Sequence, residues 1–142
     1  MLSNIYSIAD RFLPIGFADA HCDIPCGIYD PQDAIQAAQT VIRMTELIQE
    51  MGTPSSVAEH NSFARYVQVK EEHAKKAKDD ILIIWTDYFK PEHLSANPDL
   101  HTQVWEACKL GSQVKQNVDM EAAQQFKASL EKIGEIFAAT KR

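Results

Sequence analysis

Apolar residues at helical spacing dominate several stretches of this 142-residue chain. The clearest stretch runs from Gln32 to Met51. Its apolar members lie along one face of a helix: Ala34, Ile35, Ala38, Val41, Ile42, Met44, Leu47 and Ile48. Such a stripe has to be buried against other elements, which favours a helical bundle. Asp30 and Pro31 are typical of a helix start, and Gly52-Thr53-Pro54 predicts its end.

Three further helices are predicted along the chain. The second covers about Ser55 to Lys78, and the third runs from Asp99, or just before it, to about Leu110. Gly111 and Ser112 are expected to break or bend the third helix. The fourth covers Asp119 to Ala139. Four helices joined by short connections predict an all-α fold, an antiparallel up-down four-helix bundle.

The longest apolar run, Ile81 to Trp85, predicts a core segment. It is much shorter than the roughly 20 residues that span a bilayer, so we expect no membrane partner. Its β-branched and aromatic residues are compatible with either helical or extended backbone. The sequence Trp85-Thr86-Asp87-Tyr88-Phe89-Lys90-Pro91 then predicts a loop before the third helix.

Charge and cysteine content limit the functions that the chain can have. A net charge of −6 does not favour nucleic acid or an anionic membrane as a partner. Three cysteines are an odd number, which argues against the disulfide framework of a small secreted protein. Cys108 stands alone in a helical stretch and is predicted to be a small buried hydrophobe. His60, His93 and His101 lack ligand spacing and are expected to be surface or capping residues.

Residues 21 to 29 read His-Cys-Asp-Ile-Pro-Cys-Gly-Ile-Tyr and form a segment that we call the hook. Two thiols and an imidazole fall within six residues, directly after Ala-Asp-Ala, a small-residue sequence suited to cleavage. Cleavage after Ala20 would make His21 the N-terminus. The free amine, the imidazole, the backbone nitrogen of Cys22 and the thiolates of Cys22 and Cys26 could then bind one metal ion.

Residues 1–20 are therefore predicted to be a removable leader, with 21–142 as the functional domain. An export signal has a basic start and an unbroken apolar centre, whereas Asp10-Arg11 and Pro14 interrupt this segment. We expect a pro-segment and a cytoplasmic protein. A short N-terminal helix retained in the mature protein is the alternative.

The pattern His-Cys-x-x-Pro-Cys-Gly-x-Tyr after a short leader resembles the nickel superoxide dismutases. The similarity extends to Asp30-Pro31 and to the segment from Trp85 to Pro91. The resemblance implies an enzyme that converts superoxide anion to dioxygen and hydrogen peroxide by Ni(II)/Ni(III) cycling. It also implies a homohexamer of four-helix bundles and a leader-processing protease as partner.

The resemblance implies a specific ligand set for the nickel ion. The N-terminal amine of His21, the amide nitrogen and thiolate of Cys22, and the thiolate of Cys26 are the equatorial ligands. The His21 imidazole joins as an axial ligand in the oxidised state. Nitrogen and sulfur donors in a plane suit low-spin Ni(II). Structural zinc prefers four separate side chains in a tetrahedron, so zinc is the weaker assignment.

Four further residues of the family pattern are implied to act near the metal. Tyr29 and Tyr88 would lie by its open face, where a phenol can order water and restrict access. Lys90 would attract the superoxide anion. Asp23 would shape the hook, which is also the ordinary role of Asp in a turn.

Pro25 and Gly27 are predicted to set the path of the hook. The resemblance suggests a cis Ile24–Pro25 bond, although only about 5–6% of X–Pro bonds in folded proteins are cis. Gly27 is expected to adopt a turn conformation that other residues avoid.

The chain departs from the family pattern at two positions. Ala37 stands where a glutamate on the first helix commonly orients the axial His21. His73 stands where an arginine on the second helix supports the same network. These departures predict altered redox tuning rather than loss of metal binding.

Two other functions are compatible with the hook. The first is a non-enzymatic helical protein that binds nickel or copper through the same donors. The second is a thiol–disulfide pair of Cys22 and Cys26, whose short loop would add little stability. Neither requires His21 to be terminal, so the cleavage sequence before it favours the enzyme.

Overall fold

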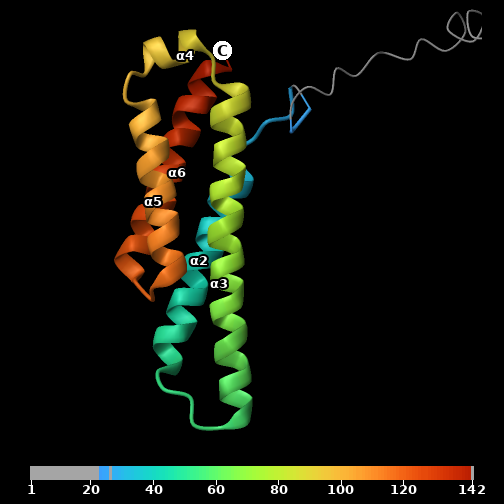
Figure 1. Cartoon of the computed structure of the whole chain (residues 1–142), viewed down its shortest axis with the longest axis vertical. Coiled ribbons are helices and arrows are strands. Elements are labelled where there is room, and N and C mark those ends of the chain that lie inside the picture. The colour runs from blue at the N-terminus through green and yellow to red at the C-terminus, as the bar shows by residue number, and fades with distance from the viewer. Residues whose placement is uncertain (1–22, 26, 142) are drawn as a thin grey trace, which may run out of the picture.

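The computed structural model describes residues 23–25 and 27–141, and its regular elements there are all helical. They are α2 (Gln32–Met51), α3 (Val57–Ile83), the π-helix η1 (Ile84–Tyr88), α4 (Pro91–Ala96), α5 (Leu100–Gln116) and α6 (Met120–Thr140). Figure 1 shows α2, α3, α5 and α6 running alternately down and up, with α3 and α6 each packed against α2 and α5. The predicted antiparallel four-helix bundle is confirmed.

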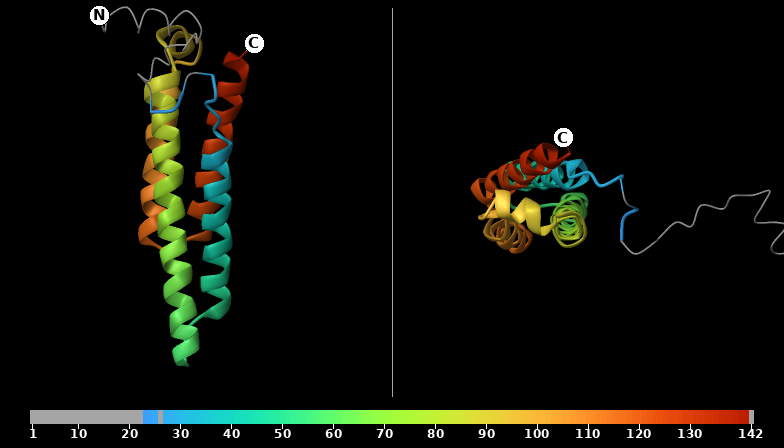
Figure 2. Two further views of the ribbon diagram at one scale, coloured as in Figure 1. Left: turned by 90° about the vertical axis from the view of Figure 1, so that its right-hand side faces the viewer. Right: turned by 90° about the horizontal axis from the view of Figure 1, so that it is seen from above.

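The core lies between these four long helices, which Figure 2 shows from the side and from above. In α6 the buried side chains recur at intervals of four and three residues, the spacing that places them on one helical face. They are Phe126, Leu130, Ile133 and Phe137. Cys108, predicted to be buried, is only half-buried on α5, and this burial raises the pKa of its thiol. No helix in the described part of the chain is long and apolar enough to cross a membrane.

Residues 81–85 are helical, so the extended alternative is wrong. The second helix is longer than predicted: it begins at Val57, capped by Ser56, and continues to Ile83 and then into η1. The Ser56 hydroxyl accepts the Glu59 N–H at 3.2 Å, which fixes this start. The segment after Lys90, predicted to be a loop, contains the short helix α4, which has Pro91 in its first turn.

Gly111 and Ser112 do not break the third helix, so this part of the prediction is wrong. α5 runs through this position to Gln116. A Cβ atom on Gly111 would lie 2.7 Å from Cγ of Lys78 and 3.0 Å from the ring of Phe126. The glycine therefore allows α5 to approach α3 and α6 closely, a packing role that local helix propensity does not reveal.

Candidate metal centre

The hook joins the bundle at the end where α4 and the C-terminal end of α6 lie (Figure 1, Figure 2). The N–H of Ile28 donates to the carbonyl of Pro25 at 3.3 Å and closes a tight turn. Gly27 has φ +95, a region that L side chains avoid, so its predicted turn role is confirmed. The Ile24–Pro25 bond is trans, not cis as the resemblance suggested, and trans is the more stable form of an X–Pro bond.

The predicted ligands His21, Cys22 and Cys26 lie outside the described residues, as does the leader, residues 1–20. Within the described ranges, no three His, Cys, Asp or Glu side chains come together to hold a metal ion. The neighbours of the predicted ligands are nevertheless placed. Asp23 follows Cys22, and Gly27 follows Cys26.

A pocket of about 310 Å³ lies where the hook meets the bundle. Its lining comes from four separate parts of the chain: the hook, η1, α4 with its N-terminal flank, and the end of α6. The lining residues are Gly27, Tyr29, Asp87, Tyr88, Lys90, His93 and Thr140. Three of the predicted site residues, Tyr29, Tyr88 and Lys90, are thus brought together.

The two tyrosines form one wall of this pocket. Tyr29 is buried, with 4% of its surface exposed, and its ring centroid lies 5.7 Å from that of Tyr88. Tyr88 also packs on Phe137 of α6, with ring centroids 4.4 Å apart. Tyr88 thus contacts both the hook, through Tyr29, and α6, through Phe137.

Which hydroxyl donates in the hydrogen bond between Tyr88 and Thr140 follows from the other bond that Thr140 makes. The Thr140 hydroxyl donates to the carbonyl of Phe137 at 2.6 Å, so its single proton is already used. The Tyr88 O–H, 2.7 Å from Oγ1 of Thr140, therefore donates to that oxygen. The Tyr88 oxygen retains acceptor capacity for water in the pocket.

Lys90 is exposed and immediately precedes α4. Its backbone N–H donates to Nδ1 of His93 at 3.1 Å, and its carbonyl accepts the His93 N–H at 2.9 Å. The His93 ring also stacks on Tyr88, at 5.6 Å between centroids and 17° between planes. His93 was predicted as a surface or capping residue. It does cap α4, but its place in the pocket wall was missed.

Asp23 is exposed, and its backbone N–H donates to Oδ2 of Asp87 at 3.1 Å. Asp87 was not predicted as a site residue, although it lies inside the family-like segment from Trp85 to Pro91. Two residues at the end of α6 were also missed. Thr140 orients Tyr88, and Lys141 donates from Nζ to the carbonyl of Tyr29 at 3.1 Å. Nothing in the local sequence around them indicates a site, because only the fold brings α6 to the hook.

The two positions that depart from the family pattern lie within the bundle helices. Ala37 is 2% exposed in the core face of α2. His73 is half-buried on α3, and its Nδ1 donates to the carbonyl of Val69 in the preceding turn at 2.9 Å. This bond ties the His73 ring to its own helix.

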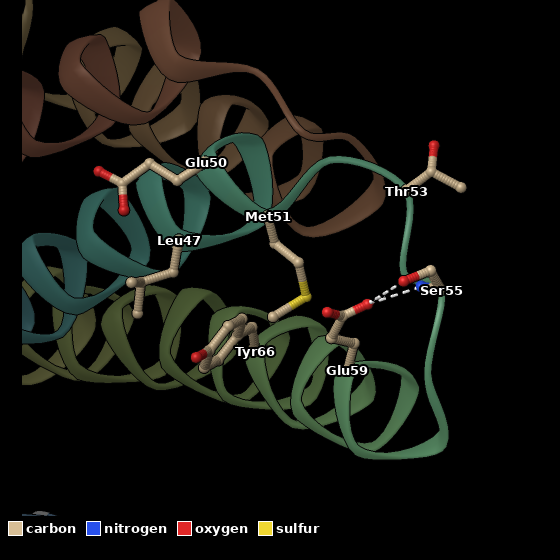
Figure 3. A pocket seen from close by; sticks show the side chains of 7 residues that line it. All are labelled: Leu47, Glu50, Met51, Thr53, Ser55, Glu59 and Tyr66. Atoms are coloured by element: carbon tan, nitrogen blue, oxygen red, sulfur yellow. Dashed lines mark hydrogen bonds between the residues drawn. The ribbon is translucent and has the colours of Figure 1, made fainter.

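A larger depression of about 540 Å³ lies at the opposite end of the bundle, between α2 and the start of α3 (Figure 1, Figure 3). Figure 3 shows its two carboxylates, Glu50 and Glu59, with Glu59 bonded to Ser55. Hydrogen bonds from Ser55 and Ser56 lower the pKa of Glu59. Glu59 is therefore occupied in capping α3, and this depression is a weaker candidate site.

Comparison with known proteins shows the family to which the chain belongs. Residues 17–141 match the family described as nickel-containing superoxide dismutase. The superoxide dismutase [Ni] of Streptomyces seoulensis is 37% identical over 131 residues, 92% of this chain and 95% of that protein. The corresponding protein of Streptomyces coelicolor is 34% identical with the same coverage. A native nickel superoxide dismutase structure aligns with a TM-score of 0.75 and 33% identity, over 86% of this chain and 100% of that one. This chain belongs to the nickel-containing superoxide dismutase family.

Proposed function

We propose that cleavage after Ala20 exposes His21 and that the mature hook binds nickel. The proposed ligands are the amine and imidazole of His21, the amide nitrogen and thiolate of Cys22, and the thiolate of Cys26. Amine, amide and thiolate donors on adjacent residues would form small chelate rings with nickel, a donor set that suits this metal. The observation that carries the proposal is the pocket beside the hook: Gly27 lines it, and Asp23 is bonded to Asp87 in its wall.

The enzyme is a nickel-dependent superoxide dismutase. Two superoxide anions and two protons give dioxygen and hydrogen peroxide. Bound nickel supplies the one-electron Ni(II)/Ni(III) couple for this reaction. The residues of the chain have to admit a small anion, exclude larger molecules and provide protons. Membership of this enzyme family sets aside the alternative of a non-enzymatic nickel or copper carrier.

We assign these tasks to the pocket residues according to the chemistry of their side chains. Lys90 lines the pocket, and we assign to its ammonium group the attraction of superoxide. Tyr29 and Tyr88 narrow the approach, because both phenol rings stand in the wall. Water that donates to the Tyr88 oxygen is a proton source within the pocket. Asp23 acts through its backbone, which ties the hook to Asp87.

The same proposal includes assembly and processing. We place the mature chain in a homohexamer in the cytoplasm, after a leader-processing protease has removed residues 1–20. Among the exposed large apolar side chains of the described residues, we assign Ile28, 67% exposed, and Trp105, 62% exposed, to subunit contacts. The interrupted apolar stretch of the leader supports a pro-segment rather than an export signal.

Substitution of Lys90 by glutamine tests whether superoxide arrives through this pocket. Removing one cation at the entrance is expected to lower kcat/KM about 3- to 10-fold at low ionic strength. The loss should shrink as salt is added, because salt screens exposed charges. Pulse radiolysis across a series of salt concentrations measures both effects.

Lys75→Gln is the matched control, since it removes the same charge from an exposed position on α3. We expect it to leave kcat/KM within about 1.5-fold of the unsubstituted enzyme, because its charge is screened from the pocket. An equal loss in both variants, or a Lys90→Gln loss that does not change with salt, would contradict the proposed entrance.

A further inference from the structure

One carboxylate in the pocket wall bonds directly to the hook. Oδ2 of Asp87 accepts the backbone N–H of Asp23 at 3.1 Å, across 64 residues of sequence. Oδ1 of the same carboxylate lies 3.0 Å from the hydroxyl of Thr86. The Thr86 hydroxyl is also 2.9 Å from the carbonyl of Leu82, so its single proton is shared, and the hook N–H is the unshared donor to Asp87.

The π-helix explains how Asp87 comes to face the hook. The N–H of Phe89 donates to the carbonyl of Ile84 at 3.2 Å, a bond that spans five residues instead of four. Ile84 and Phe89 are 1% and 8% exposed, so both ends of this wide turn are anchored in the core. The extra residue in the turn displaces Asp87 and Tyr88 toward the pocket that they line. Such single π turns often occur at functional sites.

The Asp87 contact differs in position from the other contacts that hold the hook. Lys141 donates a hydrogen bond to the carbonyl of Tyr29, which follows both hook cysteines in the sequence. Asp87 holds Asp23, which is between the two cysteines and adjacent to Cys22. The hook is thus attached to the bundle at Asp23 and again at Tyr29, on either side of Cys26.

We infer that Asp87 is a positioning residue that docks the hook on the bundle and sets the placement of Cys22. This inference rests on the proposed nickel site in the hook. The bond joins a backbone N–H to a carboxylate, and neither group belongs to the proposed ligand set. The docking contact therefore forms independently of metal binding and reduces the ordering that nickel has to impose. A charged acceptor makes the bond stronger than a neutral one would.

Asp87→Ala tests the docking in two ways. In the full chain without metal, amide exchange measured by NMR should be about 10-fold faster at Asp23, because its hydrogen bond is lost. In the processed, nickel-loaded enzyme, nickel loss to a chelator should be about 10-fold faster, as is typical for residues that orient metal ligands. Asp87→Asn retains an oxygen acceptor and should recover most of both effects.

Asp99→Ala is the control for charge and for overall stability. Asp99 is exposed at the same end of the bundle and makes no side-chain capping bond. We expect it to change neither the exchange of the Asp23 amide nor the loss of nickel. Melting curves of all three variants check that the fold is retained.

The two measurements separate this inference from the proposed function. Unchanged Asp23 exchange in a folded Asp87→Ala variant would overturn the docking role, whatever happens to nickel. Faster exchange at Asp23 with unchanged nickel loss would keep the docking contact but contradict its effect on Cys22. Failure of Cys22 and Cys26 to bind nickel at all would overturn the proposed site while leaving the exchange result intact.

Discussion

Replacing both Cys22 and Cys26 by serine is expected to abolish superoxide dismutation, with a loss of at least about 1,000-fold in rate. Serine hydroxyls remain protonated at neutral pH and are poor ligands for nickel, whereas thiolates bind it strongly. Thiolates also donate enough electron density to make Ni(III) accessible. The variant should retain less than about 0.1 nickel ion per chain after gel filtration, as expected when soft ligands are removed. Metal analysis and a superoxide assay measure the two effects.

Cys108→Ser is the matched control for this experiment. Cys108 is the remaining thiol of the chain, half-buried on α5, and burial raises the pKa of its thiol. A thiol kept protonated by burial is a poor metal ligand, so this variant should retain nickel and activity. Full activity in the double variant, or loss of nickel in Cys108→Ser, would show that the hook is not the metal site.

Lys70→Met is expected to lower the free energy of unfolding by about 3 kcal/mol. Lys70 is 2% exposed. Its ammonium donates to the carbonyl of Val114, to that of Lys115 at 3.0 Å and to that of Asn117 at 2.8 Å. Burial lowers the pKa of this ammonium, so the charge costs free energy that the three carbonyls offset.

The carbonyls that Lys70 binds lie at the C-terminal end of α5, where a helix has no partners for its last carbonyl groups. A cation there also complements the helix dipole. Methionine fills a similar volume but leaves these carbonyls without a donor. Denaturant titration measures the loss.

Lys75→Met provides the comparison for Lys70→Met. Lys75 is exposed and pairs with Asp79 on the surface of α3, so its replacement should cost less than about 0.5 kcal/mol. Because the end of α5 lies away from the hook (Figure 1), the electron-spin spectrum of nickel should be unchanged in both variants. A loss for Lys70→Met as small as for Lys75→Met would contradict its structural role.

The bundle could be predicted from sequence because its signals are local. The stripe from Gln32 to Met51 and its flanking stop residues predicted α2 with the observed bounds. The prediction failed where the role of a residue depends on its contact with a residue that is distant in the sequence. Gly111 was expected to break or bend a helix, but its role depends on Lys78 and Phe126, which belong to other helices.

The candidate site was predictable only as far as the family pattern extends. Tyr29, Tyr88 and Lys90 were expected near the metal, and the structure places all three around one pocket. Asp87 and Thr140 were missed because their contacts with the hook and with Tyr88 join residues 64 and 52 positions apart. Such contacts depend on the helix packing and on the π turn after Ile83, which the sequence pattern does not indicate.

The roles of His21, Cys22 and Cys26 remain predictions, since these residues lie outside the described ranges. The proposed roles of these three residues depend on one condition that an experiment can test. In the proposed ligand set, the nitrogen of His21 has to be a free amine, which it becomes only after residues 1–20 are removed.

The dismutation rate of nickel-loaded chains with different N-termini therefore tests whether the amine of His21 is a nickel ligand. Three chains are compared: residues 1–142, 20–142 and 21–142. The chain 20–142 is the closest control, because it has a free amine that is displaced by one residue. We predict full activity and a Ni(III) electron-spin spectrum for 21–142, and at most about 1% of that activity for the other two, since the planar chelate of amine, amide and thiolate cannot form. Equal activity of all three chains would show that the amine of His21 is not needed as a nickel ligand.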